Sequence, residues 1–141
     1  MKFFDFLDHT ADISLRMYGK DLRELFQNAA AALFQCIGGS DDARVSQWVY
    51  LSVEGIDRED LLINWLRELL YLFNARELFL SRFNIEEITD TWVKAKVGGE
   101  PVDMERHRIG REIKAVTYHG VRVEKVLSPS EHWEADVVFD V

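Results

Sequence analysis

Only two stretches of this chain carry apolar residues at helical spacing, and much of the remainder alternates apolar and polar residues as strands do. The first stretch, residues 22–37, follows Asp21, which predicts an N-cap, and ends at Gly38. The second, residues 57–73, opens on acidic residues and has one broad apolar face. Two helices cannot cover both faces of a large sheet. The sequence therefore predicts an α+β fold with two layers, in which two helices pack on one face of a mixed, mostly antiparallel sheet.

The expected strands are separated by glycine-containing turns. Gly98-Gly99 and His119-Gly120 are typical of hairpin turns, with a strand on either side of each. Strands are predicted over residues 3–7, 13–18, 48–53, 78–88, 92–97, 111–118, 121–126 and 133–140. The length of 141 residues and the absence of a linker-like segment predict one domain, 1–141.

The charge balance limits the classes of partner. Lys and Arg total 17 and Asp and Glu total 25, a formal net charge of −8. Strong direct binding to nucleic acid needs a positive surface, so none is expected. The most apolar stretch, 61–73, contains Asn64, Arg67 and Glu68 and is too polar to cross a bilayer. The N-terminal residues lack the apolar core of a signal peptide, so we expect a cytoplasmic protein with no membrane partner.

Common catalytic patterns do not occur in the sequence. It has no Gly-rich phosphate loop, no Gly-x-Ser-x-Gly and no His-Glu-x-x-His. Its one cysteine, Cys36, excludes a disulfide within the chain, and its apolar neighbours favour a small buried side chain over a nucleophile. His107 and His132 lie in polar stretches, which favours surface positions. We therefore expect no catalytic activity from this chain alone.

Two acidic clusters could supply oxygen ligands to a cation. The first, residues 8–12, offers two aspartates and a histidine between two strands, although such turns are also stabilised by Asx-type hydrogen bonds. The second lies on the last strand, where Phe139 is expected to face the core. Asp136 and Asp140 would then face away, with the carboxylate of Val141 beside Asp140. The alternative for this second cluster is a solvated tail.

Three short segments together resemble the archease family. They are Asp8-His9-Thr10-Ala11-Asp12-Ile13, Lys114-Ala115-Val116-Thr117-Tyr118-His119-Gly120 and Val137-Val138-Phe139-Asp140-Val141. The resemblance extends over nearly the whole chain. It implies a protein cofactor of the tRNA-splicing RNA ligase, which joins a 3′-phosphate or 2′,3′-cyclic-phosphate end to a 5′-hydroxyl. Such a cofactor promotes guanylylation of the ligase and its multiple turnover.

The resemblance also implies a metal at an acidic site. Carried over to this sequence, Asp12 and Asp140 are the main ligands, Val141 and His9 come next, and Asp8 follows. Oxygen ligands favour calcium, with magnesium or manganese as alternatives, and a histidine ligand leaves zinc open. If the first turn and the last strand meet at one edge of the sheet, Asp12 lies beside Asp140.

Two other functions stay open at this stage. A metal-dependent phosphohydrolase would use the same acidic cluster and would act without a partner. A general chaperone or adaptor for RNA-modifying enzymes would not need the aspartates. Lys114 and His119 could serve as acid, base or phosphate contact, or as hydrogen-bonding residues at a turn.

Overall fold

The structure is a computed structural model that describes residues 3–9, 12–39 and 42–141, without the side chains of Asp8 and His9. Two helices lie among its described elements, α1 (Leu22–Ile37) and α2 (Arg58–Arg76). The strands are β1 (Phe4–His9), β2 (Ile13–Gly19), β3 (Gln47–Glu54), β4 (Leu78–Ile88), β5 (Trp92–Pro101), β6 (Ala115–Val126) and β7 (His132–Asp140).

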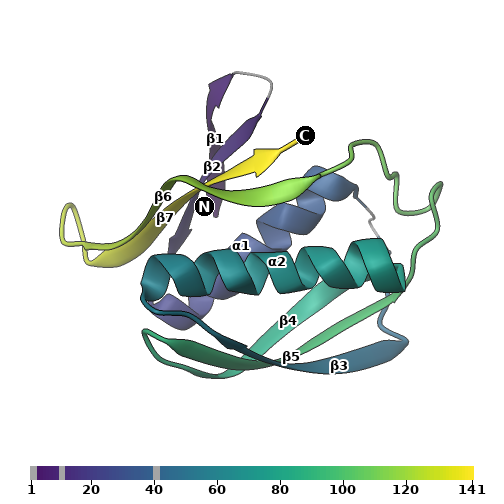
Figure 1. Ribbon diagram of the computed structural model, residues 1–141, viewed down its shortest axis with the longest axis horizontal. Coiled ribbons are helices and arrows are strands. Elements are labelled where there is room, and N and C mark those ends of the chain that lie inside the picture. Colours follow the sequence, from purple (N-terminus) through teal and green to yellow (C-terminus); the bar gives the residue numbers. More distant parts are fainter. Residues whose placement is uncertain (1–2, 10–11, 40–41) are drawn as a thin grey trace.

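The described strands form two sheets, with the helices between them (Figure 1). The four-stranded sheet has the order β1-β2-β7-β6 and the three-stranded sheet the order β3-β5-β4. Every strand pair in both sheets is antiparallel. The predicted α+β class is confirmed. The sequence predicts one sheet with both helices on one face, whereas each helix packs against strands of two sheets.

The composition of α1 explains this sandwiched arrangement. Its buried positions extend around more than half of the helix: Leu25, Phe26, Ala29, Ala30, Ala32, Leu33, Phe34 and Ile37. A helix that is apolar over so wide an arc is stable only when both sides are covered. The alanines among these residues leave room for a sheet to approach closely.

The start of α1 follows the predicted cap. The Asp21 carboxylate accepts a hydrogen bond from the Glu24 N–H at 2.8 Å, and the Glu24 carboxylate accepts one from the Lys20 N–H at 3.0 Å. Gly19 precedes this cap because a Cβ there would lie 2.4 Å from the backbone nitrogen of Leu25. The strand can therefore turn directly into the helix only with glycine at this position.

The start of α2 repeats that junction. Asp57 accepts from the Asp60 N–H at 2.8 Å, and Asp60 accepts from the Ile56 N–H at 2.9 Å. A Cβ on Gly55 would lie 2.4 Å from the nitrogen of Leu61, as at the first junction. Residues 19–25 and 55–61 are thus a short repeat of one strand-to-helix connection.

The hairpin predicted at Gly98-Gly99 is wrong, since both glycines lie inside β5. They are needed there for close packing rather than for a turn. A Cβ on Gly98 would lie 2.7 Å from the Trp48 ring, and one on Gly99 would lie 2.2 Å from the Phe79 carbonyl oxygen of the adjacent strand. Glycine inside a strand commonly marks such an approach.

The hairpin predicted at His119-Gly120 is also wrong, because one continuous strand, β6, contains both residues. Its pairing with β7 is irregular between residues 117 and 122, and Gly120 has a φ of 65°. β6 is an edge strand of the four-stranded sheet. Side chains of α2 bind its outward backbone groups: Arg67 donates to the Val116 carbonyl and Glu59 accepts from the Val123 N–H, both at 3.0 Å.

The core fills the space between the sheets around the two helices. Trp65 of α2 is fully buried, and its indole N–H donates to the Phe26 carbonyl of α1 at 3.0 Å. Leu15, Val97 and Phe139 supply fully buried side chains from three strands of the two sheets. None of the described helices is both long and apolar enough to cross a membrane.

Replacing Trp65 tests whether the helix pair holds the layers together. We expect Trp65→Ala to lower the free energy of unfolding by about 3–5 kcal/mol, because it leaves a cavity and removes the hydrogen bond from α2 to α1. Tyr71→Ala is the matched control, since Tyr71 lies on the same helix and is 57% exposed; it should change stability by no more than about 0.5 kcal/mol. Urea unfolding followed by circular dichroism measures both. Equal losses in the two variants would contradict this account of the core.

Candidate functional site

The end of the four-stranded sheet brings together residues from distant parts of the chain. In the pairing register, His9 is opposite Ile13, Ile13 is opposite Phe139, and Phe139 is opposite Val116. These backbone pairs form one row across all four strands of that sheet. The predicted ligand residues that adjoin this row in sequence therefore lie together at one end of the four-stranded sheet.

Asp12 and Asp140 occupy that edge. Asp12 comes directly before Ile13, and Asp140 directly follows Phe139, so the two are at the same end of adjacent strands. Both are exposed, and Val141 beside them is half-buried. We call Asp12, Asp140 and Val141 the acidic edge. The side chains of His9 and Asp8 lie outside the described residues, although the backbone of both belongs to β1.

Asp136 is excluded from the acidic edge although it shares the outer face of β7. Its carboxylate accepts from the guanidinium of Arg16, at 2.8 and 3.1 Å, and from that of Arg122 at 3.1 Å. Burial acts to raise the pKa of Asp136, but these hydrogen bonds outweigh it and lower the pKa overall. Asp136 is thus an ionised partner of two arginines, and its oxygens are already used.

The donor chemistry of the acidic edge fits a hard cation. Two carboxylates and a main-chain oxygen of Val141 are oxygen ligands of the kind that calcium and magnesium prefer. Within the described residues, no group of three His, Cys, Asp or Glu side chains is placed to hold a metal. The acidic edge therefore offers part of a coordination shell, and the metal assignment stays a prediction.

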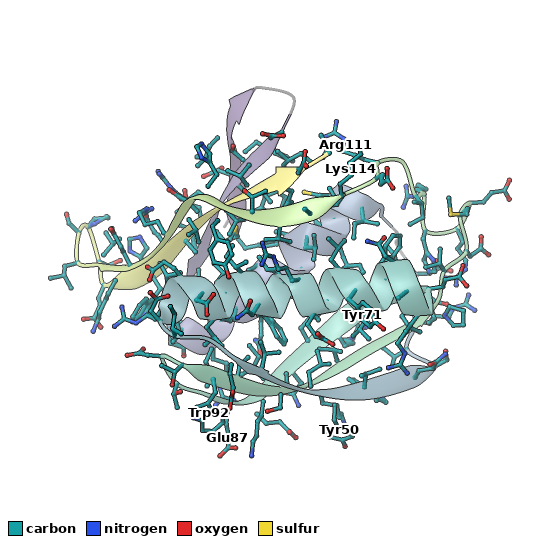
Figure 2. The ribbon with its side chains drawn as sticks, in the orientation of Figure 1. Tyr50, Tyr71, Glu87, Trp92, Arg111 and Lys114 are labelled. Carbon is teal, nitrogen blue, oxygen red and sulfur yellow. The ribbon has the colours of Figure 1, made fainter. Side chains whose placement is uncertain are left out.

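The predicted 114–120 segment lies beside this edge. Ala115 pairs with Asp140, and the Lys114 N–H donates to the Asp140 carbonyl at 2.7 Å. Lys114 is exposed, and Figure 2 shows it near the end of β7, close to Arg111. Two cationic side chains at the border of an acidic site are suited to contact a phosphate group.

Tyr118 has a structural role that the sequence did not indicate. Its hydroxyl donates to the Asp60 carboxylate of α2 at 2.5 Å, and the Arg67 guanidinium lies 4.8 Å from its ring centroid. The hydrogen bond to Asp60 raises the pKa of Tyr118 and lowers that of Asp60. His119 is exposed on the irregular part of β6. The segment thus fixes β6 to α2 through Tyr118, while Lys114 and His119 face solvent.

A second polar cluster lies where β5 ends, in the three-stranded sheet. His107, for which a surface position was expected, is fully buried and stacks on Phe79 with ring centroids 4.4 Å apart. Its Nδ1 accepts from the Asp103 N–H, so its Nε2 carries the proton and donates to Glu100 at 3.0 Å. Glu100 also forms an ion pair with Arg106. The polar neighbours of His107 in sequence supply these partners, which explains why the surface prediction is wrong.

The thiol of Cys36 carries no sign of reactivity. Burial raises its pKa to about 11, although the charge of Arg111 acts in the opposite direction. At neutral pH the thiol is therefore protonated, and a protonated thiol is a poor nucleophile and a poor metal ligand.

Comparison with known proteins agrees with the resemblance carried by the three motifs. The model of the archease protein family matches residues 4–141. The chain is 40% identical to an archease of Methanosarcina acetivorans, covering 99% of this chain and 97% of that one. It is 38% identical to an archease of Pyrococcus abyssi over the full length of both. The chain belongs to the archease family.

Solved structures show the same fold. The solution structure of a Methanobacterium thermoautotrophicum protein superimposes with a TM-score of 0.80 at 31% identity and covers both chains fully. A Thermotoga maritima archease, described as a possible chaperone, superimposes with a TM-score of 0.66 at 21% identity over 96% of this chain and 94% of that one. The arrangement of two sheets around two helices is therefore shared with solved relatives.

The Glu100 cluster predicts a pH dependence of stability. Hydrogen bonds from Arg106 are the main reason why the pKa of Glu100 falls from 4.5 to about 2. Because the folded-state pKa is the lower one, the ionised carboxylate stabilises the fold above about pH 4.5, and this contribution is lost as the pH falls toward about 2.

We expect Glu100→Gln to lower Tm at neutral pH and to make Tm less dependent on pH between these two values. Thermal unfolding followed by circular dichroism across this range measures it. Glu105→Gln is the control, because Glu105 is exposed in the same segment and should leave the profile unchanged. A Glu100→Gln profile parallel to that of the wild type would contradict the assignment.

Proposed function

We propose that this archease is a cytoplasmic protein cofactor of the tRNA-splicing RNA ligase. In this role it promotes guanylylation of the ligase and its multiple turnover, and it catalyses no reaction of its own. The observation that supports the proposal is the β2–β7 register, which sets Asp12 and Asp140 side by side on an exposed edge. An exposed site of this kind can enter the active site of another protein.

The acidic edge is the proposed cation site. Asp12 and Asp140 would supply carboxylate oxygens, with Val141 and the side chain of His9 completing the protein ligands. Calcium is the cation that we favour, with magnesium, manganese or zinc as alternatives. A bound divalent cation would neutralise the repulsion between adjacent carboxylates and the charge of a nearby phosphate.

The charge of the chain suits docking on a basic protein surface. A ligase that reacts with a nucleoside triphosphate and an RNA end must attract anions, and a chain with a net charge of −8 complements such a site. The acidic edge would enter first, and Lys114 at its border would lie toward the phosphates. Asp136 would keep its role as the partner of Arg16 and Arg122, which holds the outer face of the sheet.

Removing one carboxylate from the acidic edge tests the proposal. In a ligation assay with RNA in excess over the cognate ligase, we expect the wild type to convert single-turnover joining into multiple turnover. Asp140→Asn should abolish this activation while leaving Tm nearly unchanged, because the side chain is exposed. Asp90→Asn is the matched control, since Asp90 is an exposed aspartate in the β4–β5 turn, far from the acidic edge in sequence, and should activate fully.

Other outcomes would favour the competing functions. Activation that survives both Asp12→Asn and Asp140→Asn would point to a chaperone or adaptor that does not need the cation. Phosphodiester hydrolysis by the isolated protein, lost in the same variants, would point to a metal-dependent phosphohydrolase. A folded wild type that leaves ligation unchanged would contradict the proposed function itself.

A further inference from the structure

The outer face of the three-stranded sheet is turned away from both helices. Figure 2 shows Tyr50 and Trp92 projecting from this face on the side opposite to the helices. Trp48 and Tyr50 are 46% and 71% exposed, which is unusual for two aromatic residues on one strand. Lone exposed aromatics are common, but a group of them together with cations calls for an explanation.

The strand register arranges these side chains in two adjacent rows. In the first row Trp48 is opposite Gly98, which is opposite Arg82. In the second row Tyr50 is opposite Lys96, which is opposite Asn84. We call Trp48, Tyr50, Arg82, Asn84 and Lys96 the aromatic–basic face.

Contacts within the aromatic–basic face enclose the Trp48 ring between Gly98 and Lys96. Because Gly98 has no side chain, the Trp48 ring lies over it, and a Cβ there would be 2.7 Å from a ring carbon. The Lys96 ammonium lies 4.5 Å from the centroid of the same ring. Tyr50, directly across from Lys96, keeps most of its surface open to solvent.

The charges on this side of the sheet are segregated. The carboxylates of Glu54, Glu86 and Glu87 belong to the opposite end, where Glu54 pairs with Trp92, Glu86 lies in the bulge after Ile85, and Glu87 lies 3.9 Å from Lys94. Two cations, Lys96 and Arg82, and no carboxylate belong to the aromatic–basic face. This local positive charge occurs on a chain with a net charge of −8.

We propose that the aromatic–basic face binds a short single-stranded nucleic-acid segment, in RNA or DNA. The open Tyr50 ring can stack on an unpaired base, Lys96 and Arg82 would neutralise phosphates, and Asn84 can hydrogen-bond a base edge. Open sheet faces that present aromatic and basic residues typically hold about two or three bases. An acidic peptide would satisfy the cations but would leave the ring faces unused, so nucleic acid fits the whole set better.

The aromatic–basic face is independent of the proposed function, since it uses neither the cation site nor the ligase. The net charge of the chain argues against strong binding of nucleic acid, but not against weak binding at one local face. Two cations and one open ring predict weak binding that depends on salt, and long-range repulsion from the rest of the chain would weaken it further.

Fluorescence anisotropy with a labelled oligouridine of about 12 nucleotides, at an ionic strength of about 20 mM, tests the proposal. We expect saturable binding that Tyr50→Ala weakens by about five- to tenfold, because one stacked base is lost. Lys96→Ala should reduce the slope of log affinity against log salt by about 0.7, the value for one phosphate contact on a single strand. A thymidine oligonucleotide of equal length shows whether the sugar matters.

Two matched controls separate this face from general surface effects. Tyr71→Ala removes an aromatic side chain of similar exposure from α2, and Lys125→Ala removes an exposed lysine from β6. Both should leave affinity unchanged, and circular dichroism should show all variants folded.

Three results would overturn the proposal: no saturable binding by the folded wild type, equal losses in the Tyr50 and Tyr71 variants, or displacement of the oligonucleotide by a duplex or a polyglutamate peptide as effectively as by unlabelled single strand.

Discussion

The antiparallel pairing of β2 with β7 holds the four-stranded sheet and the acidic edge together. Seven consecutive pairs extend from Ile13 opposite Phe139 to Gly19 opposite Trp133, and the central pair, Arg16 and Asp136, is 120 positions apart in the sequence. On the inner face it buries Leu15 and other core residues, and on the outer face the two arginines bound to Asp136 hold the same register. A slip by one residue would exchange the two faces and separate Asp12 from Asp140.

The helices between the sheets determine which surfaces remain available for function. Their side chains fill the interior, and Arg67 and Glu59 also bind the outward backbone of β6, so this edge strand is covered. Arg23 and Gln27 of α1 do the same for part of β4 by hydrogen-bonding the backbone of Ile85. The outer faces of the two sheets and their ends are left open, and both proposed sites lie there. One is the acidic edge, which is suited to a cation. The other is the aromatic–basic face, which is suited to a single-stranded nucleic acid with anionic phosphates and unpaired bases.

Local features of the sequence predicted local structure well, and distant pairing explains what they did not predict. Asp21 and Asp57 mark both helix starts, because a cap depends only on neighbouring residues.

The turn predicted at Gly98 and Gly99 is wrong, because these glycines leave space for Trp48 and for the backbone near Phe79, which are distant in sequence. The same limit applies to the buried position of His107, which stacks on the distant Phe79, and to the division into two sheets. The neighbourhood of Asp12 and Asp140 could be anticipated from the family motifs. The aromatic–basic face could not, because its residues lie on three different strands that only the sheet pairing brings together.

A crystal structure of the protein grown in calcium would show whether the acidic edge binds a divalent cation. We expect an ion coordinated by carboxylate oxygens of both Asp12 and Asp140, at the calcium–oxygen distances of about 2.3–2.6 Å that are usual for this metal. An ion that occupies another part of the surface, with water alone between these two aspartates, would contradict it.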